Sequence, residues 1–403
     1  MTEERSHVMV TISGRDRPGI TAALTRVLVT HQVEILDIEQ SSLQNLLGLY
    51  FLLDLSRSSR GPDSVIKDLL FEASKLGLNL HFNLFSPGEL QPMNHKNLYV
   101  LTHFGGTQAL AELARVLEQE NANIETISTA THHGVRSMEM VVNAALASSP
   151  ARLKNALMLK SRELQVDLAV QKMEAYRKNK RLIFFDVDST LVDMEIIDEM
   201  ARSAGVFREV ARITEKAMRG DFDFEESLVQ RVALLKGLGV DQLDRILLRV
   251  PLSDGIEELA TTLKWLGYKL GIVTGGFDFF ATHLQKRLGF DFVHANRLEI
   301  REGRLTGRVA GRVIDANQKA MIVSQVSCDL GIPMDQIVVV GDGANDALML
   351  GQAGLAIAYN AKRRLESVAS ASLGKSRMGH IFHLLGITEE DIQEAMSCKQ
   401  PSS

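Results

Sequence analysis

The chain has 403 residues, of which 45% are apolar and 24% are charged, and its formal net charge is −5 at pH 7. This length and composition predict a globular protein of two or three domains, and the weak acidity excludes nucleic acid and anionic membranes as main partners. Because the N-terminus is polar and no stretch reaches the ~18 apolar residues of a membrane-spanning helix, we expect a cytoplasmic protein. Cys328 and Cys398 are the only cysteines and lie far apart, which excludes a zinc knuckle and argues against a disulfide framework.

The first half of the chain contains one pattern of strands and helices twice. The first copy predicts strands at residues 8–13, 33–42, 49–55 and 78–85, and helices at 21–30 and 64–76. The second copy predicts strands at residues 98–102, 123–131, 138–143 and 164–170, and helices at 108–120 and around 152–159. Each copy has the order βαββαβ of a ferredoxin-like domain, in which two helices cover one face of a four-stranded sheet.

The loop GRDRPG, residues 14–19, follows the first strand. Backbone N–H groups at such a strand-to-helix turn can hold a carboxylate, and Asp16 can meet an ammonium group. The alternative is a tight turn without a ligand, which the residue types alone favour.

The βαββαβ order with this DRPG loop resembles the ACT domain family over residues 6–86 and again over 96–171. The resemblance implies that the first copy binds a small amino acid and regulates an attached enzyme. It also implies a homodimer, because ACT sheets commonly pair edge to edge. The second copy has HFGGT at the equivalent loop, without Asp and Pro, so ligand binding there is in doubt. The candidate regulatory residues are Gly14, Asp16, Pro18 and Gly19.

The polar, basic residues 173–181 predict a linker, which is either irregular or helical.

The segment RLIFFDVDSTLV, residues 181–192, follows. Its unbroken apolar run predicts a buried strand of a parallel sheet, and Asp186 and Asp188 come at the end of that strand. Alternate strand residues point the same way, so the two carboxylates can share one spot, where a divalent cation such as Mg²⁺ would relieve their repulsion. Without further motifs, a helix cap and a turn acid explain this pair as well.

Residues 193–250 have helical periodicity throughout and predict a helical insertion. Helices and strands then alternate, with helices at 255–266 and 279–288 and strands at 269–273 and 337–340. This alternation predicts a doubly wound parallel sheet, whose ligands bind at the carboxyl ends of the strands.

Three further motifs lie at predicted strand ends or helix starts. Thr274, Gly275 and Gly276 offer a hydroxyl and backbone N–H groups to phosphate oxygens. Lys319, expected just before a helix, can supply a fixed positive charge, although a lone lysine is normally a solvated side chain. The motif GDGAND follows the last core strand and provides Asp342, Asn345 and Asp346.

The motifs DxDxT, TGG, lysine and GDGxND, in this order, resemble the haloacid dehalogenase superfamily, and from 182 to about 380 they resemble its phosphoserine phosphatase family. The resemblance implies that Asp186 is the nucleophile and that Asp188 is the acid and then the base. It places Mg²⁺ on the Asp186 carboxylate, the Asp188 backbone carbonyl and Asp342, with Asp346 in support. It assigns substrate binding to Glu195, Arg231, Thr274, Gly275, Gly276, Lys319, Asn345, Met218 and Phe224.

Glu195 and Arg231 match the family residues that bind the ammonium and carboxylate of serine. Met218 and Phe224 match those that close the cap over the site. Taken alone, the first two are ordinary helix-surface charges and the last two are ordinary packing residues. Thr274 replaces the serine that is usual in the family, which keeps the hydroxyl but adds a methyl group.

The sequence therefore predicts two ACT-like domains at residues 1–88 and 95–172, a linker at 173–181, and a phosphatase domain at 182–390 with a helical cap at 193–250. The implied activity is Mg²⁺-dependent hydrolysis of O-phospho-L-serine, the last step of serine synthesis, with L-serine as the expected effector. One alternative is the same chemistry on phosphohomoserine, phosphothreonine or a sugar phosphate. The other is an amino-acid-responsive binding protein with a relict phosphatase fold, against which the complete set Asp186, Asp188, Lys319 and Asp342 argues.

Overall fold

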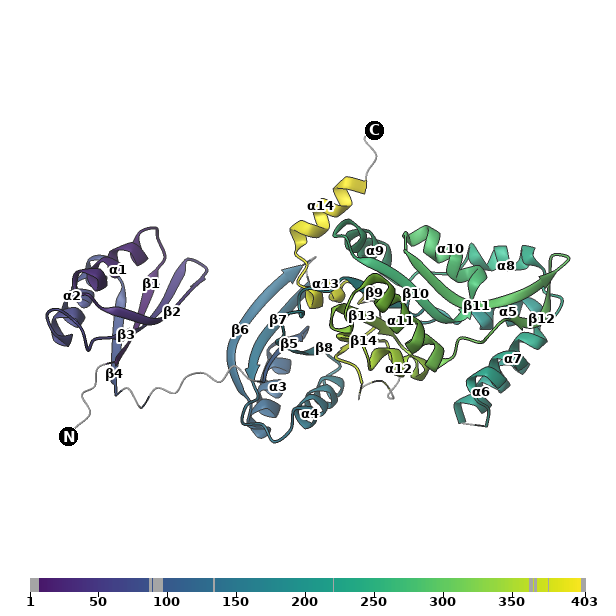
Figure 1. Ribbon diagram of the computed structural model, residues 1–403, viewed down its shortest axis with the longest axis horizontal. Coiled ribbons are helices and arrows are strands. Elements are labelled where there is room, and N and C mark those ends of the chain that lie inside the picture. The colour runs from purple at the N-terminus through teal and green to yellow at the C-terminus, as the bar shows by residue number, and fades with distance from the viewer. Residues whose placement is uncertain are drawn as a thin grey trace. The chain divides into compact units, whose positions relative to one another are not determined.

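A computed structural model describes residues 7–86, 89, 97–132, 135–219, 221–361, 365, 368–375 and 377–399 (Figure 1). The chain divides into two compact units, Met1–Asn94 and His95–Ser403, which we describe separately. No helix within these described ranges is both long and apolar enough to cross a membrane.

The first unit has the predicted βαββαβ order. Its elements are β1 (His7–Arg15), α1 (Ile20–Thr30), β2 (Glu34–Leu43), β3 (Leu46–Asp54), α2 (Pro62–Lys75) and β4 (Asn79–Phe85). The antiparallel sheet has the order β2-β3-β1-β4. Alternate residues of β1 and β3 are buried, as their sequence alternation predicts, and pack with Leu24, Leu28 and Leu69 of the two helices. Strand β2 is an edge strand whose ten residues are all exposed.

The second unit begins with the second βαββαβ copy. Its elements are β5 (Leu98–His103), α3 (Thr107–Gln119), β6 (Asn123–His132), β7 (Val135–Asn143), α4 (Pro150–Glu163) and β8 (Leu168–Lys172). Its strand order, β8-β5-β7-β6, repeats that of the first unit. The prediction of a strand at 164–170 was wrong at its start, because α4 continues to Glu163 and ends with the cap Leu164.

Residues 173–181 are turns and bends, so the helical conformation considered for this linker is wrong. Side-chain contacts hold the segment on both sides. Arg177 pairs with Glu139 of β7 at 3.2 Å, and the buried Lys180 donates from Nζ to the carbonyl oxygen of Asp335 at 2.6 Å. The segment is therefore fixed against its neighbours on both the ACT-like and the catalytic side.

The predicted phosphatase domain, which we call the catalytic part, is a mostly parallel sheet with helices. This confirms the predicted fold class. Its strands are β9 (Leu182–Phe185), β10 (Lys269–Phe277), β11 (Phe292–Arg301), β12 (Arg304–Ala310), β13 (Ile337–Gly341), β14 (Leu355–Tyr359) and β15 (Ala371–Leu373). Its helices outside the cap are α9 (Ile256–Trp265), α10 (Asp278–Leu288), α11 (Ala316–Leu330), α12 (Ala347–Leu350), α13 (His380–Leu385) and α14 (Glu389–Lys399), with the short 3₁₀ helices η2 (Met334–Gln336) and η3 (Ala344–Asp346). The central strand β9 has parallel neighbours β10 and β13, and its four residues are buried on both faces, as its apolar run predicts.

Residues 193–250 contain the four cap helices α5 (Ile196–Ala204), α6 (Phe207–Arg219), α7 (Phe224–Leu234) and α8 (Val240–Leu247). Helix α7 begins with a capping box between Asp223 and Glu226. Two segments connect the cap to the sheet, one entering the cap and one leaving it, and backbone hydrogen bonds join them. Asp193 N donates to Pro251 O at 3.0 Å, and Ser253 N donates to Leu191 O at 2.9 Å. The cap is thus connected to the sheet at one place, close to the end of the strand that precedes Asp186.

The second ACT-like copy shares one continuous sheet with the catalytic part, where β8 pairs antiparallel with β15. Asp167, which is 5% exposed, links the two further. Its carboxylate accepts from Gly374 N at 2.9 Å and lies 2.9 Å from Arg377 Nη1 and 2.7 Å from His380 Nδ1. The ring of His380 stacks on Phe104 of the HFGGT loop with centroids 3.8 Å apart. This loop is therefore in contact with the catalytic part.

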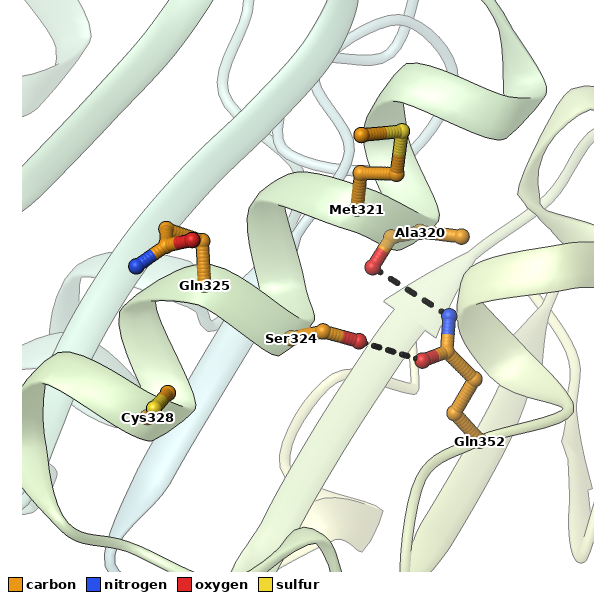
Figure 2. Close-up of a pocket in the computed structure, with 6 residues that line it drawn as sticks. All are labelled: Ala320, Met321, Ser324, Gln325, Cys328 and Gln352. Carbon is orange, nitrogen blue, oxygen red and sulfur yellow. Dashed lines mark hydrogen bonds between the residues drawn. The ribbon is translucent and has the colours of Figure 1, made fainter.

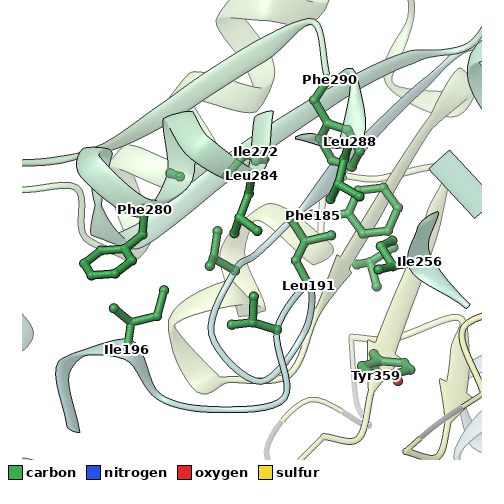
Figure 3. Packing of buried hydrophobic residues seen from close by; sticks show 14 of the residues in the cluster. Phe185, Leu191, Ile196, Ile256, Ile272, Phe280, Leu284, Leu288, Phe290 and Tyr359 are labelled. Atoms are coloured by element: carbon green, nitrogen blue, oxygen red, sulfur yellow. The ribbon is translucent and has the colours of Figure 1, made fainter. Parts of the chain in front are cut away.

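Beneath the site, apolar side chains of the sheet and its helices form the largest core cluster (Figure 3). Phe185 of β9 lies 5.5 Å from Phe290 between ring centroids, and Ile272 of β10 packs in the same cluster. Ile196, at the start of the first cap helix, belongs to it too. The core therefore fixes both the strand ends and the base of the cap.

Candidate active site

Two neighbouring parallel strands bring Asp186 and Asp342 together. Phe185 of β9 pairs with Val340 of β13, so the residues that follow these strands leave the sheet at the same edge. The backbone N–H of Asp186 also donates to Val340 O at 3.0 Å.

Asp346 joins these two residues in a cluster of three carboxylates. One oxygen from each of Asp186, Asp342 and Asp346 lies within 4.8 Å of the others, and their residues are 4%, 9% and 0% exposed. Burial first, and then the charge of Asp186, raise the pKa of Asp342 to about 8 and that of Asp346 to about 6. Such a concentration of hard oxygen donors fits a divalent cation such as Mg²⁺.

Lys319 lies within this acidic cluster and is fully buried. Its Nζ is 2.7 Å from Asp346 Oδ1 and 3.0 Å from Asp186 Oδ1. Burial alone would lower the pKa of Lys319, but the two carboxylates raise it above its ordinary value, so the ammonium group stays charged. Lys319 lies in the first turns of α11, whose N-cap is Asp315, and not before the helix as expected.

Asp188 does not belong to the three-carboxylate cluster. Its Oδ1 accepts from Ile196 N at 2.9 Å, at the start of the first cap helix. Burial, followed by the charges of Glu195 and Asp186, raises the pKa of Asp188 to about 8. A carboxyl group that keeps its proton at neutral pH is suited to act as a general acid.

The turn after Asp188 carries Ser189 with φ of 56°, a left-handed conformation that is uncommon for serine. Ser189 Oγ donates to Glu195 Oε1 at 3.1 Å. This contact places Glu195, which is exposed at the N-cap of α5, directly beside the DVDST turn.

The TGG segment adjoins Asp188 and the cap. A Cβ built on Gly276 would lie 3.1 Å from Asp188 Oδ2, and one built on Gly275 would lie 2.7 Å from Cζ of Phe224. A side chain at position 275 would displace the ring of Phe224, which packs directly on the glycine backbone. Thr274, which is 1% exposed, accepts at Oγ1 from Gly276 N at 3.0 Å, so its own hydroxyl proton remains available to a ligand.

Arg231 lies on the cap helix α7 and donates from Nε to Ser227 O at 3.2 Å. Burial lowers the pKa of its guanidinium group, which the charges of Glu195, Asp198 and Asp188 oppose. The cap thus carries a cation, Arg231, and an anion, Glu195, whose charges interact with each other and with Asp188. Asp198 was not predicted as a site residue, because an acidic residue in the first turn of a helix is ordinary.

The remaining predicted residues are placed as follows. Asn345 lies in η3 next to the acid cluster. The side chain of Met218 lies outside the described residues, although its backbone belongs to α6.

In the first unit, Gly19 has φ of 93° at the start of α1, and Asp16 N donates to Asn45 O at 2.8 Å. The ligand-binding role of Gly14, Asp16, Pro18 and Gly19 stays a prediction.

A surface pocket of about 370 Å³ lies apart from the candidate active site (Figure 2). Met321, Gln325 and Cys328 line it from the outer face of α11, opposite the buried Lys319. Gln352 closes one side by accepting from Ser324 Oγ at 2.6 Å. The pocket contains none of the predicted site residues.

Two relatives match nearly the whole chain. The phosphoserine phosphatase of Streptomyces coelicolor is 37% identical over 98% of this chain and 95% of its own length. Phosphoserine phosphatase SerB2 of Mycobacterium tuberculosis is 38% identical over 96% of this chain and 95% of its own length. The chain belongs to the phosphoserine phosphatase family.

The parts of this phosphoserine phosphatase family member also match family models. Residues 180–354 match the haloacid dehalogenase-like hydrolases, and residues 6–83 and 97–171 each match an ACT domain. The sequence-based identification of this superfamily and of two ACT domains is thus confirmed. A solved structure of a probable phosphoserine phosphatase from Vibrio cholerae, in unliganded form, is 30% identical, with a TM-score of 0.56 over 75% of this chain and 91% of that chain.

Proposed function

We propose that the protein hydrolyses O-phospho-L-serine to L-serine and phosphate through an aspartyl-phosphate on Asp186. The observation that carries this proposal is the position of Asp186, which lies 3.0 Å from the buried cation Lys319 and within a cluster of acids fit for Mg²⁺. Asp188, with its raised pKa, stands two residues further along the same turn.

The residues divide the reaction into two steps. A carboxylate oxygen of Asp186 attacks phosphorus, the bond from phosphorus to the serine oxygen breaks, and Asp188 gives its proton to that oxygen. Asp188 then takes a proton from water, whose oxygen attacks the aspartyl-phosphate and releases phosphate and free Asp186. Lys319 and the Thr274 hydroxyl bind phosphoryl oxygens.

The metal requirement follows from the carboxylates. Asp186 and Asp342 would hold Mg²⁺, with Asp346 and the backbone carbonyl of Asp188 as the other candidate ligands. When bound, the ion supplies positive charge opposite the phosphoryl oxygens. Lys319 alone cannot balance three clustered carboxylates and a phosphate group.

Two charged side chains of the cap select which phosphate ester is the substrate. Arg231 can pair with the carboxylate of phosphoserine and Glu195 with its ammonium group, a complementary pair for a zwitterion. These charges do not separate serine from homoserine or threonine, but they argue against a sugar phosphate.

We expect Arg231→Met to lower kcat/KM for O-phospho-L-serine by about 100-fold, mainly through KM, because the variant loses a charge-assisted contact in a partly buried site. Turnover of glycerol phosphate, which has no carboxylate, should change less than about threefold. Arg245→Met is the matched control, since this cap arginine is exposed and pairs only with Asp241 on its own helix among the contacts of the described residues. Equal losses on both esters would contradict the assignment of Arg231 to the amino-acid carboxylate.

We further propose that the ACT domains bind L-serine as a feedback inhibitor and join two copies of the chain. The loop from Gly14 to Gly19 in the first copy supports the ligand site, and the exposed edge strand β2 supports pairing between copies. Ile35, Leu36 and Ile38 of β2 are 37%, 43% and 46% exposed, which leaves an apolar edge for a partner strand.

Ile38→Lys places a charge on that edge and should convert a dimer into monomers in sedimentation velocity, together with a loss of inhibition by L-serine. Leu70→Lys on α2, where the leucine is 40% exposed, is the control and should change neither property. A dimer that persists in Ile38→Lys, or a wild-type enzyme insensitive to L-serine, would contradict this proposal.

A further inference from the structure

The phosphate-binding segment interrupts the pairing of β10 with β11. Val273 pairs with His294 and Phe277 pairs with Asn296, with an irregular register between them. Strand β10 advances from 273 to 277 while β11 advances from 294 to 296, so β10 carries two additional residues there. A bulge of this kind frees backbone groups from the ladder and re-aims them. The segment from Thr274 to Gly276 therefore needs other contacts to fix its peptide groups.

Asn296 supplies one such contact from the neighbouring strand, and it is 1% exposed. Its Nδ2 donates to Gly275 O at 2.8 Å, and its Oδ1 accepts from Ile314 N at 2.7 Å. A carbonyl can only accept and a backbone N–H can only donate, so these partners fix the orientation of the amide group.

The peptide group between Gly275 and Gly276 is consequently held at both ends. Asn296 binds its carbonyl oxygen, and its N–H donates to Thr274 Oγ1 at 3.0 Å. Because this N–H occupies an acceptor position of the Thr274 oxygen, the hydroxyl proton is directed elsewhere. The ring of Phe224 packs on Gly275 from the cap and restricts the same peptide further.

The second hydrogen bond of Asn296 reaches the approach to α11. Ile314 precedes Asp315, the N-cap of the helix that carries Lys319. One buried amide thus connects the TGG segment to the base of the helix that supplies the lysine. Its two bonds set the separation between two groups that the proposed function assigns to the same phosphoryl group.

We propose that Asn296 is a positioning residue for phosphoryl binding, which acts by orienting the Gly275–Gly276 peptide and, through it, the Thr274 hydroxyl as a hydrogen-bond donor. This inference rests on the proposed phosphatase function and adds a residue to it. It also explains why Thr274 can replace serine, since the bond from Gly276 N holds the hydroxyl oxygen common to both residues.

Asn296→Asp is the sharpest test, because it preserves shape and the acceptor for Ile314 N but places a carboxylate oxygen against Gly275 O. The readouts are kcat/KM with Mg²⁺, the dissociation constant of orthovanadate measured by calorimetry, and the midpoint of thermal unfolding. We expect kcat/KM to fall roughly 100-fold and orthovanadate to bind more weakly by a similar factor, since a misplaced contact of about 1 Å has this effect. Asn296→Ala, which removes both bonds without adding charge, should give the same pattern if the aspartate variant does not fold.

Gln336→Glu is the matched control. Gln336 is also buried, at 5% exposure, and its Nε2 donates to Asn179 O at 3.0 Å, but it lies before β13 at the opposite end of the sheet. This variant should lose thermal stability while the dissociation constant of orthovanadate changes less than about threefold. Equal dissociation constants of orthovanadate in the Asn296 variants and the unmodified chain would overturn the inference. Failure of the unmodified chain to hydrolyse O-phospho-L-serine would instead overturn the proposed function. Orthovanadate binding can be measured without turnover, so the two failures can be told apart.

Discussion

Asp186→Asn is expected to reduce phosphate release from O-phospho-L-serine by about 10⁴-fold or more, because an amide nitrogen or oxygen cannot replace the attacking carboxylate. The variant should nevertheless fold. Asp186 raises the pKa of both Asp342 and Asp346, so removing its charge relieves repulsion in the cluster. The measurement is Mg²⁺-dependent phosphate release combined with thermal unfolding of the same samples.

Asp193→Asn provides the control for this experiment. Asp193 lies near the same turn, but its side chain is 44% exposed and pairs with Lys375 at 2.7 Å. Exposed pairs contribute about 0–1 kcal/mol, so turnover should stay within about threefold of the unmodified chain. Substantial turnover by Asp186→Asn would contradict the covalent route and leave Asp186 as a metal ligand only.

Lys319→Met is expected to abolish turnover and also to destabilise the protein by about 3–5 kcal/mol, because it leaves buried carboxylates without their cation. Lys319 is 0% exposed and lies within 3.0 Å of oxygens of both Asp186 and Asp346. Added Mg²⁺ should recover part of the stability by restoring positive charge, without recovering activity. Urea unfolding with and without Mg²⁺ measures the first effect, and phosphate release measures the second.

Lys180→Met separates a site effect from the loss of any buried lysine. Lys180 is 7% exposed and donates to Asp335 O at 2.6 Å at the opposite end of the strands. Its loss should cost about 1–3 kcal/mol of stability with turnover nearly unchanged. If Lys319→Met were as active as Lys180→Met, Lys319 would have a structural role alone.

The sequence was informative where local pattern determines local structure. The alternation of β1 and the apolar run of β9 predicted an antiparallel, one-sided sheet and a buried parallel strand, and both are present. The boundary at 164 was missed because α4 and β8 are joined by residues without Gly or Pro, so no signal marks the end of the helix.

Contacts between distant segments could not be predicted in this way. The pairing of β8 with β15 and the three bonds of Asp167 join residues about two hundred positions apart, for which one sequence has no periodic signal. For the same reason the second ACT-like copy looked like a separate domain at 95–172. Those boundaries remain a prediction, although its HFGGT loop contacts α13 through Phe104 and His380.

The candidate site lies between these two cases. Asp186 and Asp342 were identifiable because each follows an apolar strand, and Thr274 because it follows the apolar run within β10. Parallel strands end at one edge of a sheet. Asn296 was missed because it lies within a strand and is neither charged nor beside a glycine. In the sequence it is an uncharged polar residue between Ala295 and Arg297, inside the segment ANRLEI, which resembles the family without indicating a role for this residue.

Phosphate release from O-phospho-L-serine by the unmodified chain, with and without Mg²⁺ and beside phosphothreonine, phosphohomoserine and glycerol phosphate, tests the account most directly. We expect turnover that requires Mg²⁺ and is fastest with O-phospho-L-serine. Mg²⁺-dependent hydrolysis of another ester in preference to O-phospho-L-serine would contradict the assignment of Glu195 and Arg231, and inactivity on all four esters would contradict the proposed chemistry itself.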